Sequence, residues 1–370
     1  MIKSAKFAAL FLALALLLSA CGGDAGGGEE ERIVRVGVLG GDGARAVLGI
    51  RYANQETPAV TIGGKEYTVV LAGAEEEGVS VVLDARGPGA SGEDVAALGE
   101  AGVPVIGVLC TDPGESAGGD YYFRICFPDS LQGAALAAFA AGRLSAKTAY
   151  CLGENGSAYD QDMIACFSRA FEAGGGKVTA GLFPPGAEDF SFYLNQAGDG
   201  GADLVLLPAS VIYAAQILSQ AGTLGVAVPF LGPDALDGDR LPGVVKGRGL
   251  RLYVSAAYQE GGNAGFDEGF KEYLDSDEEA MNANGGSDTV SAAAAMGYDA
   301  YRVALEAMKR AGSSDKADLM AVLPGVACQG VSGDLAFDDS GDALRDTVFI
   351  KAADSARGVW STEPVRVAGS

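Results

Sequence analysis

The chain of 370 residues contains no histidine. This absence excludes histidine-dependent catalytic triads, histidine zinc ligands and an imidazole pH switch. Positive charge is also scarce, because 26 Lys and Arg stand against 49 Asp and Glu, which gives a net charge of −23. Nucleic-acid binding and electrostatic attachment to anionic lipid both need clustered Lys and Arg, so we expect neither.

Cysteine is sparse, with six in the chain and no C-x-x-C pair. Beyond Cys21 they are Cys110, Cys126, Cys151, Cys166 and Cys328. An odd number leaves at least one thiol unpaired or intermolecular, and a chain of this length needs no disulfide to fold. Buried, inert thiols are therefore favoured over a disulfide framework, and we expect no metal site and no cofactor.

The first segment is typical of an exported protein. Two lysines precede an apolar run from Phe7 to Leu18, which is shorter than a membrane-spanning helix of about 20 residues. The quartet Leu-Ser-Ala-Cys that ends at Cys21 is similar to the cleavage box of bacterial lipoproteins. We expect a signal peptide over 1–20, lipid attachment at Cys21 and a flexible tether over 21–32, which places the protein on the extracytoplasmic face of the cell envelope. A plain secretory signal with an incidental cysteine is the alternative.

Beyond the tether, short β-branched runs alternate with Ala-rich amphipathic segments. The runs predict strands at 33–39, 67–71, 79–83, 103–109, 148–152, 204–207 and 228–231. The amphipathic segments predict helices at 131–144, 161–173, 212–221 and 291–311. This alternation indicates an α/β fold with parallel sheets, and the length favours two lobes. Ligands of such sheets bind beyond the carboxyl ends of the strands.

One connection conflicts with this pattern. Only residues 72–78 separate two predicted strands, whereas a parallel crossover usually takes a dozen residues or more. Either the two strands are not parallel neighbours or a helix is missing.

Eight short phrases share their order and spacing with a known family. They are Gly87 to Gly92, Gly102 to Pro113, Tyr122 to Gly133, Ala158 to Asp160, Glu188 to Phe190, Leu231 to Asp234, Gly297 to Tyr301 and Gly330 to Asp342. In this order they resemble the type I periplasmic binding proteins, and among them the leucine/isoleucine/valine-binding receptors of ABC transporters. Each phrase alone is weak, and the series covers nearly the whole chain beyond the tether.

The resemblance implies two Rossmann-like lobes, each with a parallel sheet, joined by a three-crossing hinge. We expect the amino-terminal lobe over 33–125 plus 257–332 and the carboxy-terminal lobe over 126–256 plus 333–370. The chain departs from the family between Leu39 and Ser91, where it is shorter and lacks helical material. It also has Ser210 and Val211 where the family often has tyrosines.

The resemblance also implies ligand contacts for a free amino acid. Ser91 and Thr111 would hold the carboxylate, the Leu109 carbonyl would receive the ammonium, and Asp234 would be its counter-charge. Cys110 belongs to the same turn as Thr111. Tyr159 would cover the ligand from the other lobe, and the small Ser210 and Val211 would leave room for a bulky side chain.

Ordinary structural roles compete with these assignments. Ser91 and Thr111 are also typical helix N-caps, Asp234 follows Gly-Pro as turn residues do, and Tyr159 is typical of a packed aromatic. Thr111 and Asp234 nevertheless each follow an apolar strand directly, which places both at strand carboxyl ends.

We therefore expect a monomeric solute receptor that delivers an amino acid to ABC permease subunits and performs no chemistry. The alternative keeps the fold and makes the protein an extracytoplasmic sensor of an amino acid, amide or other small polar ligand. An exported hydrolase is a third reading, and it is disfavoured because the acid–base inventory is poor: Cys110, for example, has no histidine to activate it.

Overall fold

The computed structural model describes residues 32–41, 45–87, 92–110, 121–345, 347–361 and 365–368. The folded body begins at Arg32. The predicted signal peptide, Cys21 and nearly all of the tether lie outside the described residues, as do Ser91 and Thr111. None of the described helices combines the length and hydropathy that a membrane crossing requires.

The first sheet has six strands in the order β2-β3-β1-β4-β5-β6. They are β1 (Ile33–Leu39), β2 (Ala59–Ile62), β3 (Lys65–Gly73), β4 (Val79–Asp84), β5 (Val105–Gly107) and β6 (Tyr122–Arg124). All neighbours pair in parallel except β2, which forms an antiparallel hairpin with β3. The carboxyl ends of β1, β4, β5 and β6 therefore meet along one edge.

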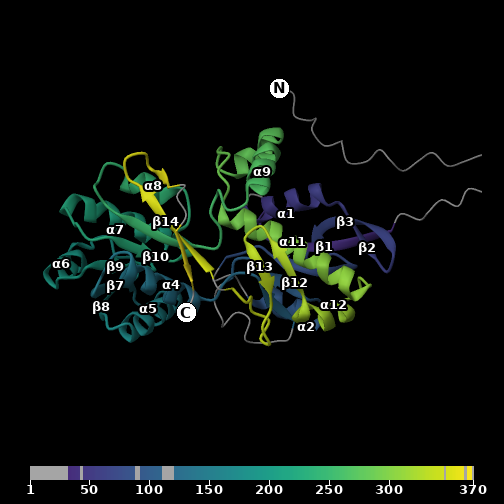
Figure 1. Cartoon of the computed structure of the whole chain (residues 1–370), viewed down its shortest axis with the longest axis horizontal. Helices are drawn as coiled ribbons and strands as arrows, with labels where there is room; N and C mark the ends of the chain where they lie inside the picture. The colour runs from purple at the N-terminus through teal and green to yellow at the C-terminus, as the bar shows by residue number, and fades with distance from the viewer. Residues whose placement is uncertain are drawn as a thin grey trace, which may run out of the picture. The chain divides into compact units, whose positions relative to one another are not determined.

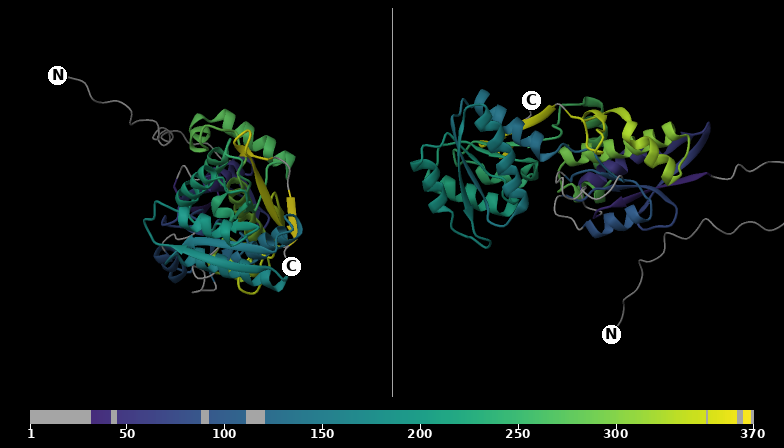
Figure 2. Two further views of the ribbon diagram at one scale, coloured as in Figure 1. Left: turned by 90° about the vertical axis from the view of Figure 1, so that its left-hand side faces the viewer. Right: turned by 90° about the horizontal axis from the view of Figure 1, so that it is seen from below.

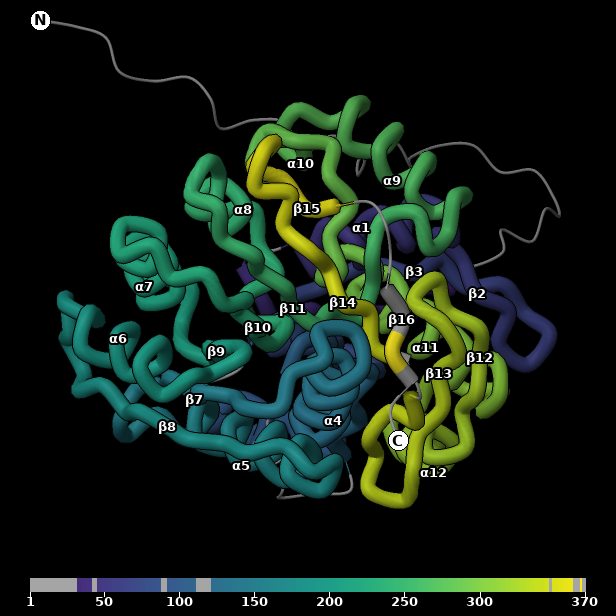
Figure 3. The backbone as a smooth tube through the Cα atoms, turned by 60° about the vertical axis from the view of Figure 1, so that its left-hand side comes forward, coloured from purple at the N-terminus to yellow at the C-terminus, as the bar shows by residue number. Residues whose placement is uncertain are grey.

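The second sheet follows the path β15-β14-β11-β10-β9-β7-β8, and β16 pairs with β14. Its parallel strands are β7 (Thr148–Glu154), β8 (Lys177–Phe183), β9 (Leu204–Leu206), β10 (Phe230–Gly232) and β11 (Leu252–Ala256). β14 (Thr347–Asp354) runs antiparallel to β11 and also pairs with β15 (Val359–Trp360) and β16 (Val365–Ala368). Figure 3 shows β14 along this edge of the sheet.

Helices cover both sheets. They are α1 (Arg45–Glu56), α2 (Gly92–Glu100), α4 (Asp129–Gly142), α5 (Ala158–Ala173), α6 (Ser191–Asp199), α7 (Val211–Leu224), α8 (Arg240–Val245), α9 (Ala264–Ser276), α10 (Glu278–Ala283), α11 (Ala292–Ala311) and α12 (Lys316–Val322). In β7 alternate side chains enter different cores: Cys151 packs with α4 and α5, whereas Leu152 packs with α6 and α7. The two lobes of the predicted α/β fold are thus present (Figures 1 and 2).

The chain passes between the two sheets three times. It leaves β6 for α4, leaves β11 for α9, and leaves the hairpin of β12 (Ala327–Gly330) and β13 (Gly333–Ala336) for β14. Each lobe is therefore built from separate parts of the sequence. The residue bounds that we expect for the lobes stay a prediction.

A buried carboxylate fixes the third passage. Asp299 of α11 is 0 % exposed and accepts hydrogen bonds from the backbone N–H groups of Val331 and Ser332, at 2.7 and 3.0 Å. The guanidinium of Arg345 then donates to the hydroxyl of Ser332 at 3.0 Å and to the carbonyl of Ile125 at 2.8 Å. One chain of hydrogen bonds therefore links α11, the β12–β13 turn and the first passage, since buried polar groups are left unpaired only at a cost.

The short connection between β3 and β4 has a structural explanation. The two strands are not neighbours, because β1 lies between them and pairs in parallel with both. The connection crosses β1 at Gly37, where an added Cβ would lie 3.1 Å from the Cα of Ala74. A glycine at this point lets the backbone cross without a helix. The sheet face there is less covered, and Ile33 and Val70 are 41 % and 39 % exposed.

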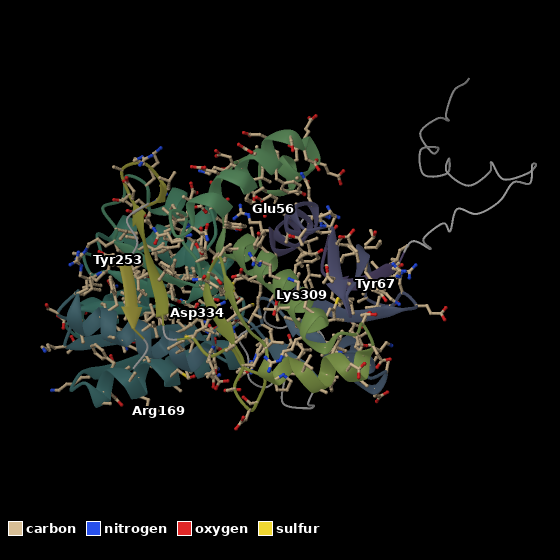
Figure 4. The ribbon with its side chains drawn as sticks, turned by 45° about the vertical axis from the view of Figure 1, so that its right-hand side comes forward. Glu56, Tyr67, Arg169, Tyr253, Lys309 and Asp334 are labelled. Atoms are coloured by element: carbon tan, nitrogen blue, oxygen red, sulfur yellow. The ribbon has the colours of Figure 1, made fainter. Side chains whose placement is uncertain are left out.

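Helices α1 and α11 pack at close range through glycine. A Cβ at Gly49 of α1 would collide with the carbonyl oxygen of Ala294, and a Cβ at Gly297 of α11 would collide with that of Ala46. A hydrogen bond also joins the two helices, because the hydroxyl of Tyr298 in α11 donates to the carboxylate of Glu56 in α1 at 2.7 Å. Figure 4 labels Glu56 at the end of α1.

We expect Gly297→Ala to lower the free energy of unfolding by about 2 kcal/mol or more, because the new methyl meets backbone that cannot move without separating the helices. This loss exceeds the gain of up to about 1 kcal/mol that alanine brings to a helix. Denaturant unfolding measures the effect. Gly198→Ala in α6, with nothing within 4 Å of the added Cβ, is the control and should leave stability unchanged or raised. Equal stability of the two variants would contradict the close packing.

Candidate functional site

The candidate site lies where strands of the second sheet end. Asp234 begins a single 3-10 turn (Asp234–Leu236) one residue after β10, and Tyr159 is the second residue of α5, which follows β7. Ser210 follows β9 and is the N-cap of α7. Because β7, β9 and β10 are parallel, these three residues lie at the same edge of the sheet.

A buried glutamine positions Asp234. The backbone N–H of Asp234 donates to Oε1 of Gln132 at 3.0 Å, and the hydroxyl of Ser255 donates to the same oxygen at 2.8 Å. Nε2 of Gln132 donates to Oδ1 of Asp129 at 3.1 Å. Gln132 is 0 % exposed. Its amide therefore connects the first turn of α4, the end of β11 and the turn after β10.

Two carboxylates share this region. Asp234 is half-buried, and burial together with the nearby Asp129 carboxylate raises the pKa of Asp234 to about 7, although the hydrogen bond with Gln132 opposes the shift. A carboxylate with a raised pKa gains from a positive partner more than a solvated one does, because its charge is not already compensated. The geometry favours a cation beside Asp234.

The hydroxyl of Tyr159 is buried and has no hydrogen-bond partner among the described residues. Burial raises its pKa well above the ordinary value, and the charges of Asp234 and Asp129 add to the shift. The neutral hydroxyl is therefore the stable form. A buried hydroxyl left unpaired costs about 1 to 3 kcal/mol, which a ligand could recover by bonding to it.

The matches to known proteins decide the family. The family model described as periplasmic binding protein matches residues 70–356, well over half of the chain. The chain belongs to the periplasmic binding protein family. Its members are solute-binding proteins rather than enzymes, and the predicted resemblance and two-lobed fold are confirmed.

Solved structures of binding proteins have a similar fold. A leucine-binding protein, LivK of Thermotoga maritima, is 26% identical, with a TM-score of 0.73 over 91% of this chain and 99% of that chain. A branched-chain amino acid transporter substrate-binding protein, LivJ of Streptococcus pneumoniae in complex with isoleucine, is 22% identical, with a TM-score of 0.70 over 90% and 100%. An ABC-transporter solute-binding protein of Rhodopseudomonas palustris in complex with p-hydroxybenzoic acid is 18% identical, with a TM-score of 0.72 over 91% and 98%. No curated protein sequence matches the chain significantly.

Leu109 and Cys110 belong to the first lobe of this binding protein and lie shortly after β5. Leu109 is half-buried, and Cys110 is 2 % exposed. The carbonyl of Cys110 accepts a hydrogen bond from the thiol of Cys126, with sulfur and oxygen 2.6 Å apart. Their predicted partners Ser91 and Thr111 lie outside the described residues, so the carboxylate-binding end of the site stays a prediction.

Ser210 and Val211 have structural roles in the binding protein. The hydroxyl of Ser210 accepts a hydrogen bond from the backbone N–H of Tyr213 at 3.5 Å and so caps α7. Val211 is half-buried and packs against the core between the second sheet and α7. Neither role excludes a ligand contact, since Ser210 is exposed at the sheet edge.

Sequence reasoning missed Asp129 and Gln132 as site residues. Both belong to the phrase that resembles the first lobe crossing, and they stand three residues apart in the first turn of α4. This spacing puts both side chains on one face of a helix that begins beside the site, which is the signal that could have found them.

The structure shows no cluster of His, Cys, Asp and Glu able to hold a metal among the described residues. No disulfide joins Cys110, Cys126, Cys151, Cys166 and Cys328 within the described part of the chain. Burial raises the pKa of the Cys126 and Cys151 thiols, the latter to about 12. Thiols of this kind are poor nucleophiles at neutral pH.

The raised pKa of Asp234 predicts a pH-dependent stability. In the unfolded chain this carboxyl ionises near pH 3.9, so between about pH 4 and 7 the folded protein binds more protons, and stability falls as the pH rises through this range. Asp234→Asn removes this effect. We expect the variant to be stabilised at pH 8 by about 1–2 kcal/mol more than at pH 5, a figure reduced because Asp234 is only half-buried.

Urea unfolding of both proteins at the two pH values measures this difference. Asp162→Asn, at an exposed position of α5, is the control and should show no difference between the two pH values. A gain for Asp234→Asn that is the same at pH 5 and pH 8 would show that the carboxyl is not perturbed.

Proposed function

We propose that this binding protein captures a free amino acid, branched-chain or similar, in the cleft between its lobes and delivers it to an ABC importer. The observation that carries the proposal is the juxtaposition, at one sheet edge, of Asp234, Asp129 and the hydroxyl of Tyr159, which has no hydrogen-bond partner in the part of the chain that the structure describes. A carboxylate and a hydroxyl donor or acceptor suit an ammonium group.

The charge of the site distinguishes among ligands of structurally similar proteins. One of these proteins is in complex with isoleucine and another with p-hydroxybenzoic acid. The two carboxylates around Tyr159 attract an ammonium group and repel a carboxylate that lies in the same place. This supports an amino acid over an aromatic acid without an amino group.

Binding would act through closure. Three passages join the lobes, and the Arg45–Asp239 ion pair also links them, so the ligand can bring the two sheet edges together without unfolding either lobe. Ser91, Thr111 and the Leu109 carbonyl would engage the ligand from the first lobe, while Asp234 and Tyr159 engage it from the second. The closed form would be the one that the permease binds.

The proposal predicts that an amino acid raises the thermal midpoint of the purified protein. At 100 times the dissociation constant a ligand adds about 2.7 kcal/mol of stability, which corresponds to a shift of several degrees. We expect one or more of the twenty amino acids to give this shift at pH 8, where Asp234 is mostly ionised. We also expect 4-hydroxybenzoate to give none.

Variants identify the ammonium site in the same experiment. Asp234→Asn should lower the affinity for the amino acid by at least a hundredfold, and Tyr159→Phe should lower it by about tenfold, the loss of one hydrogen bond. Asp162→Asn should bind as the unmodified protein does. No shift with any amino acid, or a shift that Asp234→Asn retains in full, would overturn the proposal.

We propose further that the protein is a lipoprotein anchored through Cys21. The Leu-Ser-Ala-Cys quartet after the apolar run supports this. In cells of a bacterial host, Cys21→Ser should move the protein from the detergent phase to the aqueous phase of a detergent phase-partition assay. Cys166→Ser, at a half-buried position in α5, is the matched control and should stay in the detergent phase. A Cys21→Ser protein that still enters the detergent phase would contradict lipid attachment at this residue.

A further inference from the structure

A cavity of about 420 Å³ lies away from the candidate amino-acid site. It is lined by the start of α8, the second passage between the lobes, the segment 285–290 and the turn from β14 to β15. None of Asp234, Tyr159, Ser210 and Leu109 lines it. Its volume is in the range of ordinary small-molecule sites.

The cavity wall contains an unsatisfied acceptor. Gln259, in the second passage, is 2 % exposed, and its Nε2 donates to the carbonyl of Ser361 at 2.8 Å. Its Oε1 is buried and has no hydrogen-bond partner among the described residues. Because an unpaired buried acceptor is costly, a molecule that brings an N–H or O–H group to Oε1 would relieve this cost.

An indole forms another part of the wall. Trp360 donates its Nε1–H to the carbonyl of Gly238 at 3.2 Å, so its polar atom is already bonded. The ammonium of Lys351 lies 5.3 Å from the centre of the indole ring. Together with Pro242 and Val290, the ring offers an apolar surface suited to a flat group.

The charged groups around the cavity are mostly compensated. Lys351 pairs with Asp237, Asp239 pairs with Arg45, and Glu260 pairs with Lys271. Asp288 and Arg357, of opposite sign, are both exposed. The enclosed part of the cavity therefore has no net charge to satisfy, which favours an uncharged ligand.

We propose that this cavity is a second binding site, which takes a small, uncharged aromatic molecule whose N–H or O–H group donates to Oε1 of Gln259. The site is independent of the proposed amino-acid function, because it shares no residue with it. Its ligand would touch the second passage and both lobes at once, since the segment 285–290 precedes α11 and Trp360 belongs to β15.

The cavity contains its own reporter, because Trp360 is the only tryptophan in the chain. Benzamide is the probe, a single ring with an amide N–H donor, and N,N-dimethylbenzamide is its matched control without a donor. We expect benzamide to change the emission of Trp360 along a saturable curve. We expect the dimethyl compound to bind at least tenfold more weakly, the cost of leaving Oε1 unpaired.

Variants test whether Gln259 makes the contact with the ligand. Gln259→Met keeps the length of the side chain without the amide and should bind both compounds with equal affinity. Gln161→Met, at an exposed position of α5, should keep the tenfold difference, and Asp234→Asn should keep it as well. The comparison of the two compounds on the unmodified protein needs no variant, so the test stands even if Gln259→Met does not fold. Absence of saturable benzamide binding, equal affinities for the two compounds, or a difference that Gln259→Met retains would each overturn the proposal.

Discussion

The candidate site depends on the buried amide of Gln132. All of its polar atoms are engaged, since Oε1 accepts from Ser255 and from the backbone of Asp234, while Nε2 donates to Asp129. An unpaired amide would be costly at this depth, so the partners are held together as a unit. Gln132 follows the first passage between the lobes and Ser255 precedes the second. The same amide therefore fixes both the acidic edge of the second lobe and its position relative to two of the passages.

The sequence predicts the strands that are apolar along their whole length, and β4 is an example, with all six residues buried. It does not predict β8, because this edge strand buries only two of its seven residues and so has no apolar run to detect. The position of Asp234 near a strand carboxyl end was predictable because it follows an apolar run closely in sequence, and its contact with a ligand stays a prediction. The role of Gln132 was not predictable, since its partners Asp234 and Ser255 stand 102 and 123 residues away in sequence. No local sequence pattern indicates contacts at that separation.

The short connection in the first lobe affects the face of the sheet and leaves the paired carboxyl ends of its strands in place. The connection between β3 and β4 contains no helix, and the glycine at position 37 lets this connection cross β1 directly. Part of one sheet face is left uncovered, at Ile33 and Val70. The connection does not disturb the carboxyl ends of the strands, where Leu39 of β1 pairs in register with Asp84 of β4. A short connection on the face of a sheet therefore leaves the carboxyl edge intact, because face and edge are built by different residues.

The charges at the site connect stability with binding. The folded protein holds the Asp234 carboxyl close to Asp129 and gives the Tyr159 hydroxyl no hydrogen-bond partner among the described residues, and both arrangements disfavour the empty site. An ammonium group placed between them would compensate the carboxylate charge and give the hydroxyl a partner in one step. A ligand shifts a conformational equilibrium only by the difference in its affinity for the two states. Under the proposed function, this difference would come from the Asp234 and Asp129 charges and from the Tyr159 hydroxyl, so the unfavourable charge of the empty site would supply part of the free energy for closure.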